Sequence, residues 1–274
     1  MKIKKHLLFF LFLLLVFNHN SAQSISFDTT YVAKVQISVL YFEEGEEVYT
    51  LWGHLALRII DSNDQSDLVY NFGTFNFDTK NFYIKFLQGN LNYYLSSNNF
   101  TDYLNFFRTE QNRGLQEYVL DLNLHQKKIV LDDLVTTYKY HPTYHYDFLY
   151  DNCATRIANI LYKTKSFPIF IPESPLKSFR DAVLYFPAEM NQNLLKLGID
   201  ILLGSHADKK LNDTSFGFLP RLFWYQLSAA DYKNNVIKSD KIWVPFKTIT
   251  NHHINMVLIF ICLLLAYMIY LIVS

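Results

Sequence analysis

The chain has 274 residues, a formal net charge of zero and a pI near 7.1, so it carries no excess positive charge that would indicate nucleic acid binding. Aromatic residues make up 17% of the chain, which suits a large core and also a surface that rests on lipid headgroups. Its two cysteines are Cys153 and Cys262, and no disulfide is expected because Cys262 lies in an apolar C-terminal stretch.

The first 23 residues have the pattern of a secretory signal peptide. Three lysines precede an apolar run from Leu7 to Phe17, and small residues follow up to Ala22. The apolar run is too short to span a bilayer comfortably, so we expect cleavage near Ala22 or Gln23. The remainder of the chain is therefore predicted to be exported.

A second apolar segment, residues 254–273, is predicted to be a transmembrane helix. At about 1.5 Å per residue it is long enough to cross the hydrocarbon core. The segment is flanked on the side of the folded domain by Lys238, Lys241 and Lys247, which runs against the positive-inside tendency. We therefore infer the orientation from the signal peptide. We expect a protein of the inner (cytoplasmic) membrane, with its domain on the extracytoplasmic or periplasmic side.

Three strands are predicted to open the domain, at Val32–Phe42, Leu55–Ile60 and Leu68–Phe77. All three are rich in β-branched, aliphatic or aromatic residues, and turn residues separate them. Gly73 interrupts the third strand and indicates a bulge or a close approach of another group. The opening of the domain is therefore a sheet.

The middle of the domain is predicted to alternate between strands and helices. Pro142 closes a helix whose apolar residues recur at helical spacing, and another helix begins at Cys153. The expected elements are a helical segment at 82–87, an extended segment at 91–95, a helix start at 101–108, a strand at 117–122, and helices at 125–141 and 153–162. Together they predict an α+β domain over residues 24–166.

Residues 167–253 are predicted to be an accessory extension made of loops and a helix. Prolines at positions 168, 172, 175 and 187 indicate a segment rich in loops. Residues 191–203 are apolar enough for a helix that rests on the membrane or on the domain. Because the residues suited to chemistry all precede this segment, we expect it to shape a substrate groove.

Cys153 is the leading candidate for a catalytic residue. A lone thiol in an oxidising compartment is a liability unless it reacts, and acyl transfer is the chemistry it suits best. The N-terminus of the following helix and the guanidinium of Arg156 both favour the thiolate. His54 is the best candidate for a general base, and Asn71 on a neighbouring strand is placed to orient its imidazole.

Two further residues have functional and structural interpretations. Arg58 shares a strand face with His54 and is a candidate for binding an anionic headgroup or an oxyanion, with pairing to Asp61 or another carboxylate as the alternative. Asp151 is a candidate supporting residue, although we favour a role as the N-cap of the helix that begins at Cys153.

Metal and nucleotide chemistry find little support in the sequence. His141 and His145 have the four-residue spacing of helical metal ligands, but Pro142 breaks the helix between them. No paired-cysteine motif and no glycine-rich phosphate loop is present. We therefore expect no metal and no cofactor.

Three motifs in order carry a resemblance to a known family. Trp52-Gly53-His54-Leu55-Ala56-Leu57-Arg58, Tyr70-Asn71-Phe72-Gly73-Thr74-Phe75 and Tyr150-Asp151-Asn152-Cys153-Ala154-Thr155-Arg156 resemble the N-terminal extracytoplasmic domain of the Lnb family. Members of that family are lipoprotein N-acyltransferases. The resemblance covers roughly Val32 to Leu161, and it implies a fold similar to the circularly permuted NlpC/P60 papain-like domains, with an antiparallel sheet and a cysteine-bearing helix.

The resemblance also implies an activity and partners. Cys153 would be the nucleophile, His54 its base and Asn71 a weaker candidate for orienting the base. An acyl chain would pass from the lipid moiety of a lipoprotein to its N-terminal amine through a thioester on Cys153, which divides one difficult exchange into two easier steps. The expected partners are the membrane and a lipid-modified protein or phospholipid. The alternatives are a papain-like cysteine hydrolase of the envelope and a non-catalytic envelope scaffold.

Overall fold

The computed structural model describes residues 27–45, 48–76, 78–80, 85, 91–111, 113–165, 167, 174–189 and 193–246. Across these residues the chain forms an α+β domain around one antiparallel sheet, as the sequence predicted. The strands are β1 (Val35–Phe42), β2 (His54–Asp61), β3 (Ser66–Thr74), β4 (Asn92–Asn99), β5 (Leu115–Leu120), β6 (Thr143–His145) and β7 (Ile237–Val244). The α-helices are α2 (Thr29–Val32), α4 (Phe100–Phe106), α5 (Leu124–Tyr140), α6 (Cys153–Tyr162), α7 (Phe179–Glu189), α8 (Asn193–Leu202) and α9 (Pro220–Asn234).

The seven strands lie in the order β6-β4-β3-β2-β1-β5-β7, and each neighbouring pair is antiparallel. One row of paired residues crosses four neighbouring strands at one end of the sheet: His54 pairs with Phe42, Phe42 with Leu115, and Leu115 with Val244. This row places the start of β2 and the end of β7 at the same end of the sheet.

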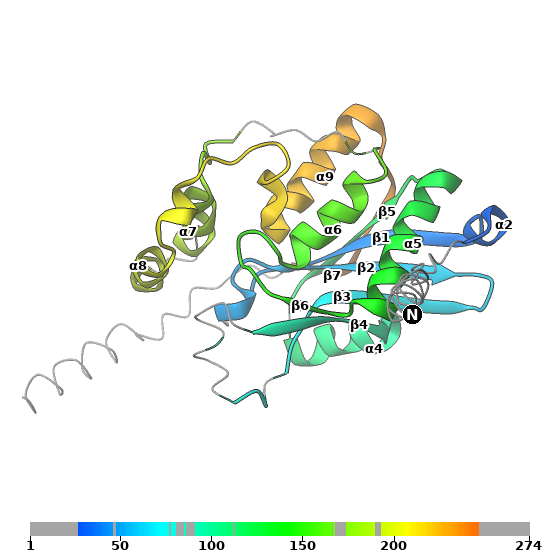
Figure 1. Ribbon diagram of the computed structural model, residues 1–274, viewed down its shortest axis with the longest axis horizontal. Coiled ribbons are helices and arrows are strands. Elements are labelled where there is room, and N and C mark those ends of the chain that lie inside the picture. The colour runs from blue at the N-terminus through cyan, green and yellow to red at the C-terminus, as the bar shows by residue number, and fades with distance from the viewer. Residues whose placement is uncertain are drawn as a thin grey trace, which may run out of the picture.

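Helices cover both faces of the sheet (Figure 1). Helices α5, α6 and α9 lie on one face, where Leu55, Leu57 and Phe72 join the largest hydrophobic cluster. On the other face α4 packs over a smaller cluster that includes Ala56 and Val69. Because side chains alternate along a strand, His54 and Arg58 point to the α4 face. The sequence predicted this shared face correctly.

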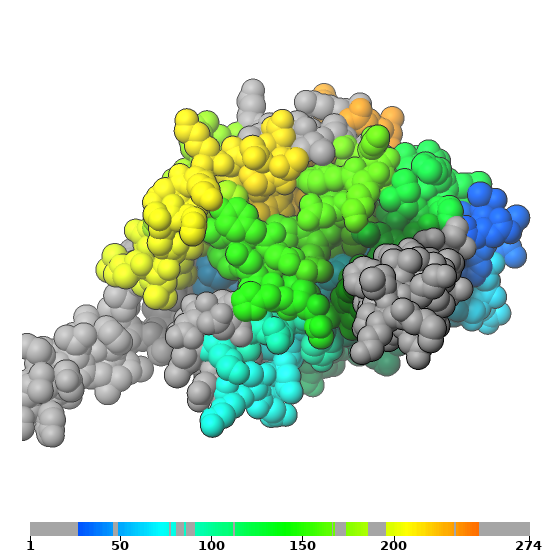
Figure 2. Space-filling model, viewed as in Figure 1, coloured from blue at the N-terminus to red at the C-terminus, as the bar shows by residue number. Residues whose placement is uncertain are grey.

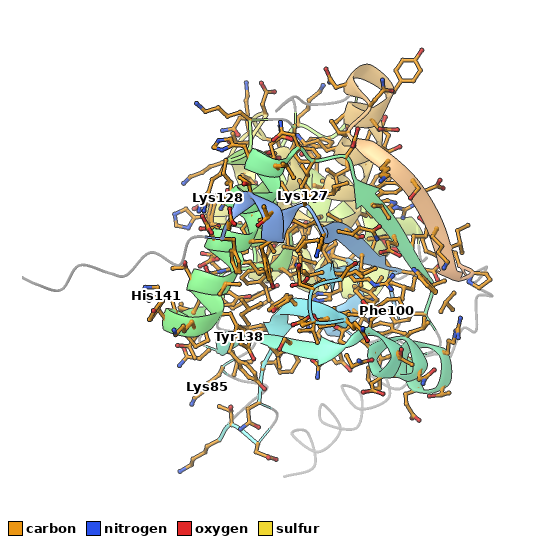
Figure 3. All side chains as sticks on the ribbon, turned by 90° about the vertical axis from the view of Figure 1, so that its right-hand side faces the viewer. Lys85, Phe100, Lys127, Lys128, Tyr138 and His141 are labelled. Atoms are coloured by element: carbon orange, nitrogen blue, oxygen red, sulfur yellow. The ribbon has the colours of Figure 1, made fainter. Side chains whose placement is uncertain are left out.

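Arg58 lies buried in the centre of the α4 face. Its guanidinium makes bidentate bonds to Asp67, at 2.7 and 2.8 Å, and to Glu117, at 2.9 and 3.1 Å. The ring of Phe100, at the start of α4, lies 3.4 Å from the guanidinium carbon, and Figure 3 marks its position between helix and sheet. Arg58 is therefore a structural cation between strands. This agrees with the alternative that Arg58 pairs with a carboxylate, although its partners are Asp67 and Glu117 and not Asp61.

The segment after residue 167 contains more regular structure than its prolines predicted. Helix α7 continues through Pro187, and α7 and α8 lie beside each other at one end of the molecule, where they form the yellow region of Figure 2. Strand β7 pairs with β5 as the edge of the main sheet. This part of the predicted accessory extension therefore completes the sheet, because β5 would otherwise present an unpaired edge.

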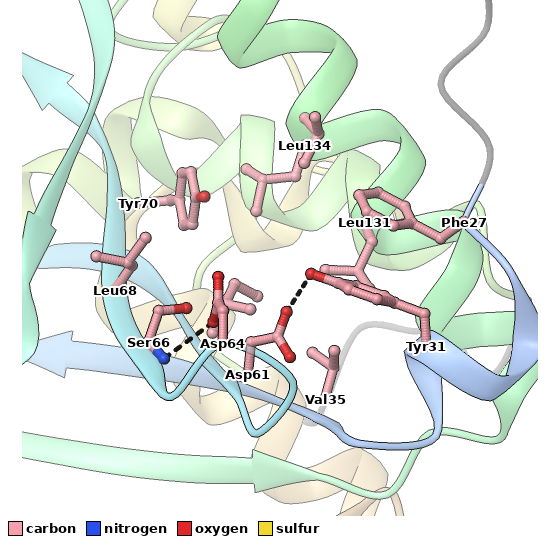
Figure 4. A pocket seen from close by; sticks show the side chains of 12 residues that line it. Phe27, Tyr31, Val35, Asp61, Asp64, Ser66, Leu68, Tyr70, Leu131 and Leu134 are labelled. Carbon is pink, nitrogen blue, oxygen red and sulfur yellow. Dashed lines mark hydrogen bonds between the residues drawn. The ribbon is translucent and has the colours of Figure 1, made fainter.

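A small cavity of about 110 Å³ lies at the opposite end of β2 from His54 (Figure 4). There the Tyr31 hydroxyl of α2 donates a hydrogen bond to Asp61, the last residue of β2, and the backbone N–H of Ser66 donates to Asp64 at 3.0 Å. The first bond joins α2 to the end of β2, and the second lies within the β2–β3 turn. The cavity is remote from Cys153 and has no part in the site described below.

The predicted signal peptide, residues 1–23, and the predicted transmembrane helix, residues 254–273, both lie outside the described residues. The helical segment predicted at 82–87 also falls outside them, apart from Lys85. Among the helices that the structure does describe, none combines the length and the apolar character needed to cross a bilayer.

Candidate active site

Cys153 is the first residue of α6, as the sequence predicted, but the residue that caps the helix is Asn152. The Asn152 side-chain oxygen accepts hydrogen bonds from the backbone N–H groups of Ala154, at 2.8 Å, and Thr155, at 3.0 Å. The Thr155 hydroxyl accepts a bond from the backbone N–H of Asn152 in return, which completes a capping box. The prediction that Asp151 caps this helix was therefore wrong by one residue.

Asn152 also joins α6 to two loops. Its side-chain nitrogen donates to the carbonyl oxygens of Phe148, at 2.8 Å, and Phe218, at 3.0 Å, and the residue is almost fully buried. All the hydrogen-bonding capacity of this amide is thus used in placing the first turn of α6. The position of the Cys153 thiol follows from that placement.

Replacing Asn152 by alanine is expected to lower the free energy of unfolding by about 2–4 kcal/mol. Loss of the cap costs about 1 kcal/mol, and each carbonyl left without a partner costs a further ~1 kcal/mol or more. Asn123→Ala is the matched control, because Asn123 makes the same capping box on α5 at an exposed position. Urea unfolding should show a loss of only about 1 kcal/mol for the control. Equal losses would contradict the role of the two loop contacts.

His54 begins β2 directly after Gly53, whose positive φ of 74° a side chain would strain. The Nε2 atom of His54 lies 2.7 Å from the side-chain oxygen of Asn71 on β3. That oxygen also accepts a bond from the backbone N–H of Gly73 at 2.7 Å, while the Asn71 side-chain nitrogen donates to the Tyr103 hydroxyl at 3.0 Å. The amide is therefore fixed with its oxygen toward the imidazole.

This arrangement leaves Nδ1 of His54 as the ring nitrogen available to a substrate or a thiol. With Nε2 bonded to Asn71, a neutral imidazole carries its proton on Nε2 and its lone pair on Nδ1. Gly73 lies so close to the ring that a Cβ at this position would come within 2.3 Å of Cε1 of His54. The bulge between Asn71 and Thr74, which the sequence predicted at Gly73, makes this close approach possible.

One large pocket, with a cavity volume of about 710 Å³, brings Cys153 together with His54 and Asn71. Cys153 comes from α6 on one face of the sheet and His54 points to the other face, so the two residues meet at the end of the sheet. Most of the other lining residues are apolar or aromatic: Tyr49, Trp52, Phe75, Tyr93, Phe106, Phe107, Tyr146, Phe148, Leu149, Ile199, Leu202, Leu203, Leu219 and Pro220. The pocket suits an apolar ligand with a polar reacting group.

The thiol and the imidazole line the same pocket, and no hydrogen bond joins them in this structure. The backbone N–H of Leu55, the residue after His54, lies close enough to Cys153 to lower the pKa of its thiol. Catalytic contacts are often long in a ligand-free site and shorten when substrate binds. Substrate binding would have to bring the sulfur to Nδ1.

Burial makes both groups neutral at physiological pH. It raises the pKa of the Cys153 thiol to about 11, against the opposing effect of nearby backbone N–H groups. Burial also lowers the pKa of His54 to about 4; the bond to Asn71 opposes this shift, and the charge of Arg113 adds to it. The sequence predicted that the helix N-terminus and Arg156 favour the thiolate; this expectation is corrected because burial outweighs the effect of the backbone N–H groups, and Arg156 pairs with Asp151 instead.

Alkylation of Cys153 by iodoacetamide is therefore expected to be slow at neutral pH. Only the thiolate reacts, so the rate should rise about tenfold per pH unit from pH 6 toward the thiol pKa of about 11. Peptide mapping by mass spectrometry separates Cys153 from Cys262. A rate that has already reached its plateau below pH 7 would show instead that a thiolate–imidazolium pair exists in the free protein.

Arg113 is a buried cation in the wall of the same pocket. Its Nε atom donates to the backbone oxygen of Glu43 at 2.6 Å, and its Nη2 atom is buried and has no hydrogen-bond partner among the described residues. Burial lowers the pKa of this guanidinium, and the charge of Glu44 has the largest opposing effect. Arg113 is the cation whose charge reaches His54 and favours its neutral, basic form.

The structure does not bring three of the predicted residues into the pocket. Arg58 lies farther along β2, in the ion pairs described above. Arg156 makes a bidentate pair with Asp151, at 2.6 and 2.7 Å, and its guanidinium stacks on the ring of Tyr144 at 3.7 Å. Asp151 and Arg156 thus support the turn before α6, and neither contacts the thiol.

Sequence reasoning missed Asn152, Tyr103 and Arg113. The cap had a local signal, because Asn152 precedes Thr155 by three residues and both are residue types that form capping boxes. Tyr103 and Arg113 have no such signal. They lie more than thirty residues from Asn71 and His54, and only the packing of α4 and the start of β5 against the sheet brings them near.

Comparison with known proteins identifies one family. The family described as "Lnb N-terminal periplasmic domain" matches residues 23–182, which is more than half of the chain and contains His54, Asn71 and Cys153. No curated protein and no solved structure matches the chain. The family match confirms the resemblance that the three sequence motifs indicated.

Proposed function

Because the chain belongs to the family of the Lnb N-terminal periplasmic domain, we propose that it is an extracytoplasmic thiol acyltransferase acting on lipid-modified proteins. The family gives the domain a periplasmic location. The acceptor in this proposal is the N-terminal amine of a lipoprotein, and the donor is an acyl ester of its lipid moiety.

The single observation that carries the proposal is the meeting of Cys153, His54 and Asn71 at one pocket. A nucleophile, a base and a group that orients the base are the parts that nucleophilic acyl transfer requires. They lie on three different elements, α6, β2 and β3, each held by the core. Rigid supporting elements suit a reaction that depends on orientation.

In the first step the Cys153 sulfur attacks the ester carbonyl carbon of the donor while Nδ1 of His54 takes the thiol proton. The bond between carbonyl carbon and alcohol oxygen then breaks, and the alcohol leaves with the proton from His54. In the second step the acceptor amine attacks the thioester, loses a proton to His54, and releases the N-acylated product. The sulfur regains a proton from His54, so the thiol is restored.

In the resting state the thiol holds its proton and the imidazole has a free lone pair, so the proton has to pass from sulfur to Nδ1 as the sulfur attacks. Burial opposes this transfer by lowering the pKa of His54, whereas the hydrogen bond to Asn71 raises that pKa and so stabilises the imidazolium that forms. The aromatic and aliphatic walls of the pocket provide an environment for an acyl chain beside the sulfur.

We further propose that the domain is a permuted papain-like domain anchored in the inner membrane by residues 254–273. The order of histidine before cysteine and the position of the thiol at a helix N-terminus support the first part. The length and apolar character of residues 254–273 support the second. A tether to the membrane would keep the thiol near lipid-linked substrates.

Mass spectrometry of lipoprotein N-termini tests the acyl acceptor. Cells that carry the gene should contain N-acylated lipoproteins, and cells that lack it or carry Cys153→Ala should contain the free amine. Unchanged N-termini together with a released fatty acid or peptide would instead identify a hydrolase of the same site. Unchanged N-termini, no released product and no phenotype of Cys153→Ala would identify a scaffold.

A further inference from the structure

The mouth of the pocket carries exposed apolar side chains from three separate elements. Tyr49 precedes β2, Phe106 ends α4, and Leu202 ends α8; they are 43%, 46% and 68% exposed, and all three line the pocket. On α8 the side chains of Leu197 and Ile201 extend this apolar surface, at 55% and 75% exposure. These five residues are called the rim below.

The rim differs from scattered surface hydrophobics because three of its members, Tyr49, Phe106 and Leu202, line one pocket, and the other two lie on the helix that contains Leu202. Single exposed apolar side chains are common and carry no meaning, whereas contiguous apolar surface beside a binding site marks an interaction surface. Leu197 and Ile201 are four residues apart, so they lie on the same side of α8. The same helix contributes Ile199 and Leu202 to the pocket wall, and Leu203 directly after it lines the pocket as well, so the outer surface is continuous with the pocket.

The path of the chain at the end of β7 indicates what the rim faces. The register of the sheet places Val244, at the end of β7, in the same cross-strand row as His54. Phe246 follows, packs against Tyr41, and lies where a side chain at Gly114 would be, next to Arg113 of the pocket wall. The chain therefore leaves the described domain beside the pocket.

The predicted membrane span begins close to this exit. Ile254 follows Phe246 by eight positions, and eight extended residues reach at most about 28 Å. A bilayer that holds residues 254–273 must therefore lie near the pocket end of the sheet. Tyr232 marks the other end of the molecule, because it precedes the start of β7, where Ile237 pairs with Leu120.

We propose that the rim rests on the bilayer surface, with Leu197, Ile201 and Leu202 of α8 among the lipid acyl chains or headgroups, so that the pocket opens toward lipid. Apolar faces of interfacial helices lie about 5–10 Å into this boundary. The identity of what enters the pocket rests on the proposed function. The contact between rim and lipid rests on the proposed membrane anchor at residues 254–273, on the exposure of the rim and on the path of the chain, but not on acyl transfer.

A depth measurement on the full-length protein tests the contact without using the reaction. In a Cys153→Ala, Cys262→Ser background, a fluorophore is attached through Ile201→Cys or, as control, through Tyr232→Cys, which is 93% exposed on α9. The protein is reconstituted in vesicles of phosphatidylethanolamine and phosphatidylglycerol, with or without brominated acyl chains. We expect at least a roughly twofold loss of fluorescence at position 201 and none at position 232.

Two outcomes would overturn the proposal. An absence of quenching at position 201 excludes lipid contact. This holds whether the fluorophore is then surrounded by water or covered by protein, such as a second copy of the chain. Equal quenching at both positions excludes a defined orientation.

A second experiment measures acyl transfer by a Leu197→Glu, Ile201→Glu double variant, with Tyr232→Glu as control. Transfer from substrate in vesicles should fall about tenfold in the double variant, while transfer from a detergent-dispersed substrate should not fall. If neither substrate form reacts with wild-type protein, the proposed function fails but the depth result stands.

Discussion

Cys153→Ser is expected to lower acyl transfer at least about 1000-fold while leaving the domain folded. A hydroxyl is far less acidic and less nucleophilic than a thiol, so giving its proton to the imidazole of His54 costs far more free energy than the same transfer from the Cys153 thiol, whose pKa is about 11. Transfer rates and urea unfolding curves of the purified variant measure the two parts of the prediction. The free energy of unfolding should change by no more than about 1 kcal/mol, because the substitution is nearly isosteric.

His54→Ala should reduce transfer to a similar degree, since the same proton transfer is lost. His125→Ala is its matched control, because His125 is exposed on α5 and distant from the pocket. Normal transfer by either Cys153→Ser or His54→Ala would show that Cys153 and His54 do not act together as the nucleophile and its base. Loss of transfer in the His125 variant would show that the assay responds to stability instead of chemistry.

Gly73→Ala is expected to reduce kcat/KM about 100-fold, although Gly73 has no reacting atom. The added Cβ would lie 2.3 Å from Cε1 and 3.0 Å from Nε2 of His54, so the ring has to move away. That movement breaks the 2.7 Å bond to Asn71 and displaces Nδ1 from the pocket position it needs. A displacement of about 1 Å is enough to cost two orders of magnitude in rate.

Gly198→Ala provides the control for Gly73→Ala, because nothing lies within 4 Å of a Cβ added there. It should leave transfer unchanged and add slightly to stability, since alanine favours a helix interior over glycine by about 1 kcal/mol. Near-normal transfer by Gly73→Ala would mean that the imidazole can act from another position. Thermal unfolding of both variants separates this rate effect from a loss of fold.

Much of the fold followed from local pattern. The predicted strands at 32–42, 55–60 and 68–77 became β1, β2 and β3 with ends shifted by up to three residues, and the helix predicted at 153–162 has those bounds in the structure. Strands β1 and β2 are buried on both faces, so runs of β-branched, aliphatic and aromatic residues between turns identified them, whereas helical spacing identified α6. Strand β7 was harder to predict, because it is an edge strand with charged residues and so lacks an apolar pattern.

The candidate site also has some features that the sequence predicted and others that only the folded structure shows. Residue type and motif indicated Cys153, His54 and Asn71, and the structure places all three at one pocket. The partners of charged residues could not be read from the sequence, since Arg58 pairs across strands with Glu117 and Arg156 pairs with Asp151. Pairing of this kind depends on which side chains meet in three dimensions. For the same reason the pKa of the thiol rose where the sequence predicted a fall, because burial is a property of the packed domain.

The most direct test of the central claim is the intact mass of the purified protein after brief exposure to a lipoprotein whose N-terminal amine is blocked. Because the acceptor cannot react, the acyl group should stay on the enzyme as a thioester. The account predicts one added acyl mass, mapped to the peptide that contains Cys153, removed by neutral hydroxylamine and absent from Cys153→Ala. An unmodified Cys153 under these conditions, or an acyl group on another residue, would contradict it.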